Sequence, residues 1–128
     1  MTRDKILIVE DDKNISKLVR YNLEKAGFDC ESTITGEDAL LALDKHAFDL
    51  IVLDIMLPKI DGLQILRTLK EKKIKNGPII LLTNLGQDSI VKDGFKAGAA
   101  GYLIKSAMSP DQVLHEVRVF LNKSREDK

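Results

Sequence analysis

Short apolar runs recur along the chain, and each is too short to form a helix. They cover residues 6–9, 50–53, 79–82 and 102–104. Runs of this length without polar alternation are typical of strands that are covered on both faces of a parallel sheet. Residues 28–33 differ, because apolar Phe28 and Cys30 alternate with Asp29 and Glu31. That alternation predicts a half-covered strand at the edge of the sheet.

The segments between these runs have helical spacing. One apolar face is followed by Gly27, a typical helix stop, and consists of Ile15, Leu18, Val19, Leu23 and Ala26. Residues 35–38 carry the start signal [ST]-x-x-[DE], and an apolar face follows it at Ala39, Leu40 and Leu43. A third face follows Gly62 and consists of Leu63, Leu66 and Leu69.

The last two predicted helices have unequal signals. Residues 88–97 form a weak pattern, because Gly94 lies inside it and Gly98 ends it. The fifth helix has a capping serine, a proline suited to the first turn and a glutamine that completes a capping box: Ser109, Pro110 and Gln112. Its predicted core face is Val113, Val117, Phe120 and Leu121, and we expect the charged tail 123–128 to fray.

Strands and helices therefore alternate five times, which predicts an α/β fold of the (βα)5 type. Right-handed crossovers would place helices on both faces of one parallel sheet, giving a doubly wound structure. Residues 1–128 contain no linker or repeat, so we expect a single domain.

Composition and charge exclude several classes of function. Twenty basic and twenty acidic residues cancel, so net charge favours neither direct nucleic-acid binding nor an anionic membrane. Cys30 is the only cysteine and cannot form an internal disulfide. The polar N-terminus and the shortness of every apolar run predict a cytoplasmic protein without a membrane segment.

Candidate chemistry follows the strands. Ligands of open α/β sheets bind outside the carboxyl ends of the strands. The first strand is followed by three acids, Glu10, Asp11 and Asp12, and the third, fourth and fifth by Asp54, Thr83 and Lys105. Carboxylates, a hydroxyl and an amine would thus meet at one edge of the sheet. For Asp12 alone we favour helix capping, and Thr83 or Lys105 alone would be a weak signal.

The convergence of these groups has a chemical logic. Clustered carboxylates repel one another unless a cation neutralises them, and Mg²⁺ binds through one or two carboxylates while keeping several waters. One carboxylate could then attack phosphorus and become an aspartyl-phosphate. Lys105 and Thr83 would hold the phosphoryl oxygens.

The same residues resemble the receiver domain of bacterial two-component response regulators. The resemblance covers residues 6–12, the loop 53–62 with its Pro-x-x-Asp-Gly sequence, the pair Leu82-Thr83, and residues 98–105. It spans nearly the whole chain. It implies a flavodoxin-like fold with strand order 2-1-3-4-5 and a phosphoacceptor signalling domain rather than a turnover enzyme.

The resemblance also implies roles for individual residues. Asp54 would be the phosphoacceptor, and Thr83 and Lys105 would contact the phosphoryl group. The implied Mg²⁺ ligands are Asp11, Asp54 and the backbone carbonyl of Met56, with Glu10 acting largely through water. Thr83 and Tyr102 would form the switch. The implied partners are a histidine kinase or phosphotransfer protein and a downstream effector that binds the fourth helix, fifth strand and fifth helix.

Departures from the family pattern qualify these expectations. Ser106 stands where proline is usual after the lysine, so we predict a trans Lys105–Ser106 bond with the amine still reaching the acids. Asn84 replaces a smaller residue after Thr83 and would crowd the site. Residues 98–101 lack an acidic pair, which puts a phosphorylation-dependent salt-bridged homodimer in doubt. By resemblance, apolar Met56 and Leu85 flank the path of the water that hydrolyses the phosphoryl group, which predicts slow loss.

Three alternatives have different requirements. A haloacid-dehalogenase-type phosphatase needs a second acid where Met56 stands, and a flavodoxin-like cofactor site would not place three acids next to a phosphate. A degenerate receiver that binds partners without phosphorylation stays open because of Asn84 and Ser106.

Overall fold

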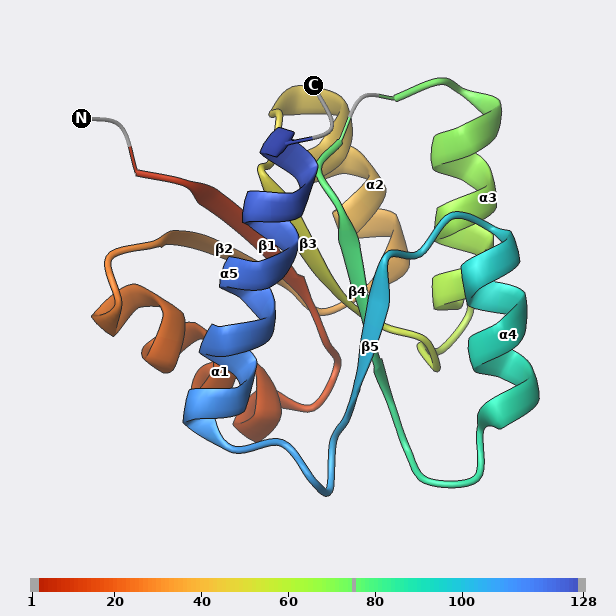
Figure 1. The fold of residues 1–128 in the computed structure, drawn as a ribbon. Helices are drawn as coiled ribbons and strands as arrows, with labels where there is room; N and C mark the ends of the chain where they lie inside the picture. The colour runs from red at the N-terminus through yellow and green to blue at the C-terminus, as the bar shows by residue number, and fades with distance from the viewer. Residues whose placement is uncertain (1–2, 75, 127–128) are drawn as a thin grey trace.

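Strands and helices alternate along the whole described chain. The computed structural model describes residues 3–74 and 76–126. The strands are β1 (Lys5–Val9), β2 (Asp29–Thr33), β3 (Leu50–Asp54), β4 (Ile79–Thr83) and β5 (Gly101–Ile104). The helices are α1 (Lys13–Lys25), α2 (Gly36–Lys45), α3 (Gly62–Glu71), α4 (Asp88–Lys96) and α5 (Pro110–Glu126) (Figure 1).

All five strands form one parallel sheet in the order β2-β1-β3-β4-β5, which confirms the predicted fold and strand order. Every residue of the central strands β3 and β4 is buried. The edge strand β2 buries Cys30 and leaves Asp29 exposed, as its alternating pattern predicted. Central burial explains the continuous apolar runs of β1, β3 and β4. The run 102–104 was also expected to be covered on both faces, but it forms the edge strand β5, where Tyr102 is 46% exposed.

Helices cover both faces of the sheet (Figure 1). Helices α1 and α5 pack with one set of strand residues, which includes Ile8 and Val52. Helices α2, α3 and α4 pack with the alternate set, which includes Leu7 and Leu53. Successive strand residues point to opposite faces, so one apolar run supplies both cores.

Local signals end the elements where the sequence predicted. Thr35 Oγ1 accepts the Asp38 N–H at 3.1 Å and caps α2. Ser109 Oγ accepts the Gln112 N–H at 3.2 Å at the start of α5. Gly98 follows α4 with φ +110°, a backbone conformation that residues with a side chain rarely adopt. Of these three residues, Ser109 lies in the β5–α5 loop, which begins with the candidate site residue Lys105.

One expectation about the helices was wrong. Leu18 was predicted on the core face of α1 but is 47% exposed, because Val19 and Leu23 fill the space against the sheet. The expected fraying of the charged tail 123–128 stays a prediction, and α5 extends to Glu126. Arg125 forms an ion pair with Asp4 and ties the last turn to the beginning of the sheet. Residues 127–128 lie outside the described part of the chain.

None of the helices in the described residues is long and apolar enough to span a membrane.

Candidate functional site

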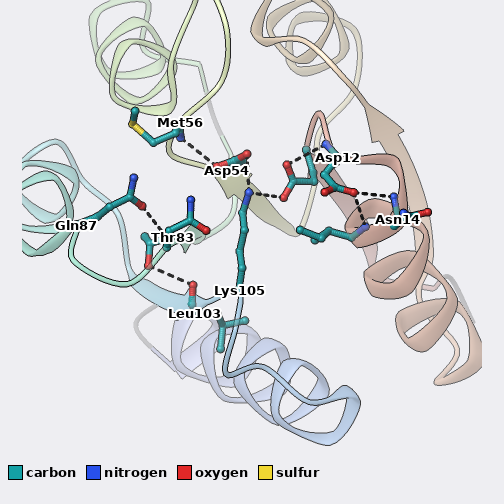
Figure 2. Close-up of polar contacts among 11 residues, drawn as sticks. Asp12, Asn14, Asp54, Met56, Thr83, Gln87, Leu103 and Lys105 are labelled. Atoms are coloured by element: carbon teal, nitrogen blue, oxygen red, sulfur yellow. Dashed lines mark hydrogen bonds and ion pairs between the residues drawn. The ribbon is translucent and has the colours of Figure 1, made fainter.

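The carboxyl ends of four strands bring the predicted polar residues together. Asp54 and Thr83 are the last residues of β3 and β4, and Glu10 and Lys105 directly follow β1 and β5. Figure 2 shows the Lys105 side chain extending along the strand ends to Asp54. Because parallel strands end at the same edge, residues far apart in sequence become neighbours.

Asp54 is held by contacts to both carboxylate oxygens. Its Oδ1 accepts the Met56 N–H at 3.0 Å, and its Oδ2 accepts a hydrogen bond from Lys105 Nζ at 2.8 Å (Figure 2). The side chain is only 2% exposed. Gly62 lets α3 begin close behind it, since a Cβ there would lie 2.7 Å from Ile55 Cα and 2.8 Å from the Asp54 carbonyl oxygen.

Glu10 is completely buried beside the same lysine. Its Oε2 accepts the Asp12 N–H at 3.2 Å, and Lys105 Nζ lies 2.7 Å from Oε1. The lysine contact to Oε1 has ion-pair distance but lacks hydrogen-bond direction, so this buried oxygen has no hydrogen-bond partner. Burial, with the neighbouring Asp54 carboxylate, raises the pKa of Glu10 to about 8.

Lys105 forms ion pairs with both buried carboxyl groups, those of Glu10 and Asp54. Burial alone would lower the pKa of its ammonium, but the contacts with Asp54 and Glu10 outweigh burial and raise it. The two shifts are consistent, because one ammonium cannot neutralise two carboxylates and a proton on Glu10 relieves the excess negative charge. At neutral pH without a cation, the site therefore favours a charged lysine and a protonated Glu10.

Glu10, Asp11 and Asp54 form an acidic cluster in which one oxygen of each lies within 4.8 Å of the others. Asp11 is exposed, so the cluster is open to solvent on its side. Three carboxylates and the unpartnered Glu10 Oε1 match the hard oxygen ligands that Mg²⁺ prefers. Asp12 is outside this cluster, since its Oδ1 accepts the N–H groups of Asn14 and Ile15 and caps α1, as expected for that residue.

Thr83 and Tyr102 line the same hollow. Thr83 is 2% exposed, and its hydroxyl donates a long 3.5 Å bond to the Leu103 carbonyl. Tyr102 is 46% exposed, and its ring packs edge-on against Phe95 with centroids 6.1 Å apart. Both residues line a cavity of about 310 Å³ beneath the β4–α4 loop. In this conformation the tyrosine ring is therefore partly exposed and packed against α4.

Gln87 was not predicted from the sequence. Its Oε1 accepts the Asn84 N–H at 2.6 Å and closes the β4–α4 loop (Figure 2). A glutamine three residues after an asparagine is too common a pair to identify such a contact in advance. The bond folds the loop back on itself at the residue that departs from the family pattern.

The other departures are accommodated without loss of the site. The described residues contain no cis peptide bond, so the Lys105–Ser106 bond is trans and the amine still reaches the acids, as predicted. Met56 and Leu85 are 51% and 73% exposed and leave the site open on their side.

Comparison with known proteins identifies the family. The model of the response regulator receiver domain matches residues 6–118. The chain belongs to this receiver family. The Bacillus subtilis alkaline phosphatase synthesis regulator PhoP is 38% identical, over 94% of this chain and 49% of its own length. The Rhizobium meliloti phosphate regulon regulator PhoB is 34% identical, over 94% and 53%.

Solved receivers share the architecture. A Francisella response regulator receiver has a TM-score of 0.85 at 30% identity and covers 94% of this chain and 98% of its own. The BeF3-activated receiver domain of DrrB has a TM-score of 0.82 at 40% identity, with coverage of 94% and 99%. The chain spans about half the length of the curated relatives named above.

Proposed function

We propose that this receiver accepts a phosphoryl group on Asp54 from the phosphohistidine of a histidine kinase or phosphotransfer protein. The carrying observation is that Asp54 is buried, held by Met56 and Lys105, and clustered with Glu10 and Asp11. A carboxylate whose two oxygens are both held by hydrogen bonds is already oriented to act as a nucleophile. We infer that residues 1–128 act as one such unit in the cytoplasm.

The transfer step is a displacement at phosphorus. An Asp54 oxygen forms the new P–O bond while the P–N bond to the donor imidazole breaks and its electron pair returns to nitrogen. The Lys105 ammonium lies 2.8 Å from Asp54. It would therefore stabilise the negative charge that develops on the phosphoryl oxygens. The chain thereby catalyses only its own phosphorylation and dephosphorylation and is not a turnover enzyme.

Mg²⁺ would be held by Glu10, Asp11, Asp54 and the Met56 carbonyl, and when bound it would neutralise carboxylate and phosphoryl charge. Because its pKa is raised, Glu10 holds a proton at neutral pH, and it would release that proton when the cation binds. Asp11 contributes an open carboxylate at the solvent side.

The output would be a change on the α4–β5–α5 face. A phosphoryl group on Asp54 would draw the Thr83 hydroxyl away from its weak bond to Leu103, and the 310 Å³ cavity offers space for Tyr102 to turn inward. Phe95, Tyr102 and Val119 are exposed apolar residues on this face and would contact a downstream effector protein or domain.

Mass spectrometry after incubation with acetyl phosphate and Mg²⁺ tests this function. We expect one added phosphoryl group, and none with EDTA or in Asp54→Asn, whose amide is not a nucleophile. Asp12→Asn is the matched control, since asparagine also caps a helix and labelling should persist. Labelling of another carboxylate in Asp54→Asn would contradict the assignment. Absence of labelling in the folded wild type would favour the phosphorylation-independent receiver.

A further inference from the structure

A groove with an apolar floor and a cationic rim lies between α3 and α4, at the end of the sheet opposite Asp54. It consists of two hollows of about 420 and 280 Å³ that share Lys70 and Ala97. Leu66, Leu69 and Ile79 form its floor, and the last of these begins β4. Its cations are Arg67, Lys70, Lys73 and Lys96. We call this the cationic groove.

The charges of the cationic groove have no partners of their own. All four cations are exposed, and in the residues that the structure describes none lies within 4.0 Å of a carboxylate oxygen. Asp93 is the single acid among the lining residues, which leaves a local excess of three positive charges. The whole chain has zero net charge, so a matching excess of acids must lie elsewhere.

Helix α2 carries such an excess around an exposed leucine. Leu41 is 57% exposed. Glu37 lies four residues before it, Asp38 lies three residues before it, and Asp44 lies three residues after it. This spacing places all three acids beside Leu41 on the outer face of the helix. None of them forms an ion pair within the described chain, and Lys45 is the one base at a neighbouring helical position. We call this the acidic patch.

The two surfaces lie in the same layer of the molecule. Helices α2, α3 and α4 cover one face of the sheet, and α3 contacts both of the others (Figure 1). A two-fold axis parallel to α3 would bring α2 of one copy over the α3–α4 side of the other, and the reverse contact would form at the same time. A closed dimer with two identical contacts follows from this symmetry.

We propose that two copies of this protein associate through these surfaces, with the acidic patch of each seated on the cationic groove of the other. Leu41 would cover apolar floor, while the acids meet the cations at the rim. An acidic patch in the same layer would repel nucleic acid and anionic membranes, so the observed charges favour a second copy. The contact uses the side of α4 next to α3 and does not include β5, α5 or Asp54, so it would not require phosphorylation.

Charge reversal with sedimentation velocity tests the proposal. The groove variant is Lys70→Glu with Lys96→Glu, and the patch variant is Asp38→Lys with Asp44→Lys. Each should be monomeric alone, because each places like charges opposite each other. An equimolar mixture should form a heterodimer, since both contacts are again between opposite charges. Wild-type association should weaken about tenfold between about 50 and about 500 mM salt.

Controls separate this interface from others. Lys13→Glu with Lys17→Glu changes charge equally on exposed positions of α1 and should dimerise like the wild type, as should Asp54→Asn. Circular dichroism confirms that each variant is folded. A monomeric wild type at low salt, a monomeric mixture, or a dimer that survives either reversal would overturn the proposal. Binding of a DNA duplex by a monomeric wild type, lost in the groove variant, would assign the groove to nucleic acid instead.

Discussion

Lys105 is the residue on which the electrostatics of the site depend. Its amine lies 2.7 Å from Glu10 and 2.8 Å from Asp54, and its side chain is 13% exposed. A single positive charge between two buried carboxyls leaves one carboxyl inadequately compensated. Burial and the uncompensated charge of Asp54 together raise the pKa of Glu10 to about 8. The site is therefore poised to exchange the proton on Glu10 for a cation.

Replacing Glu10 by glutamine should stabilise the metal-free protein at high pH. Unfolded Glu10 titrates near its ordinary pKa of 4.5 and folded Glu10 near 8, so between these values the folded state holds a proton that the unfolded state has lost. The stabilising contribution is complete below 4.5 and disappears as pH rises through 8. Glu10→Gln should remove this loss and gain on the order of 1–3 kcal/mol at pH 9.

Urea unfolding in EDTA at several pH values measures this difference. The relevant quantity is the free energy of unfolding of Glu10→Gln minus that of the wild type, because all other ionisable groups are present in both proteins. If this difference in unfolding free energy does not change between pH 5 and pH 9 by more than the experimental error, the raised pKa of Glu10 is contradicted.

Met56 and Leu85 should govern how long the phosphoryl group persists. Both are exposed apolar residues beside the site and cannot orient a hydrolytic water. Positioning of the nucleophile is a large part of phosphoryl-transfer catalysis. Met56→Asn with Leu85→Glu should therefore speed decay of phosphorylated Asp54 by about tenfold or more. Decay is followed by mass spectrometry after donor removal, and Met56→Leu with Leu85→Met is the apolar control. Equal rates in all three proteins would exclude this role.

At the scale of elements, the sequence predicts what depends on local pattern. The apolar runs, the Thr35 and Ser109 caps and the glycine stops are local, and all appear where expected. The contact of Gln87 with Asn84 and that of Arg125 with Asp4 depend on how side chains meet in three dimensions. The second of these joins the last turn of α5 to the residue before β1, a contact that no local pattern reveals.

Gly94 weakens the sequence signal for α4, but close packing against the sheet explains why a glycine stands there. A Cβ at Gly94 would lie 2.5 Å from Leu81 Cδ1, and Leu81 is completely buried in β4. Alanine gains about 1 kcal/mol of helix propensity, but crowding a packed core costs about 1–3 kcal/mol. Gly94→Ala should thus destabilise the protein by roughly 1 kcal/mol.

A double-mutant cycle separates crowding from propensity. Leu81→Val removes the crowded Cδ1 atom, so Gly94→Ala should cost less, or become stabilising, in that background. Free energies of unfolding of the four proteins give the coupling energy, which should be about 1 kcal/mol. Purely additive effects would show that Leu81 does not limit the approach of α4.

At the scale of the whole molecule, the doubly wound sheet places the candidate site and the proposed association surfaces in different regions. Its carboxyl edge gathers Glu10, Asp54, Thr83 and Lys105 from four strands, and this convergence was predictable because topology alone imposes it. The cationic groove and acidic patch were not foreseen, because net charge conceals how charges are distributed over the surface.

Mg²⁺ should stabilise the whole fold, and more so at higher pH. A ligand that binds only the folded state adds RT ln(1 + [L]/Kd), about 1.4 kcal/mol at ten times the Kd. Because Glu10 must lose its proton to serve as a ligand, apparent Mg²⁺ affinity should rise as pH increases toward the pKa of about 8. Asp11→Asn and Asp54→Asn should each reduce the stabilisation, since each removes a carboxylate from the cluster. Asp12→Asn should keep it, because Asp12 caps α1 and is not in the cluster. Thermal unfolding with Mg²⁺ titrated at constant ionic strength measures these effects, and equal stabilisation of all four proteins would place the metal elsewhere.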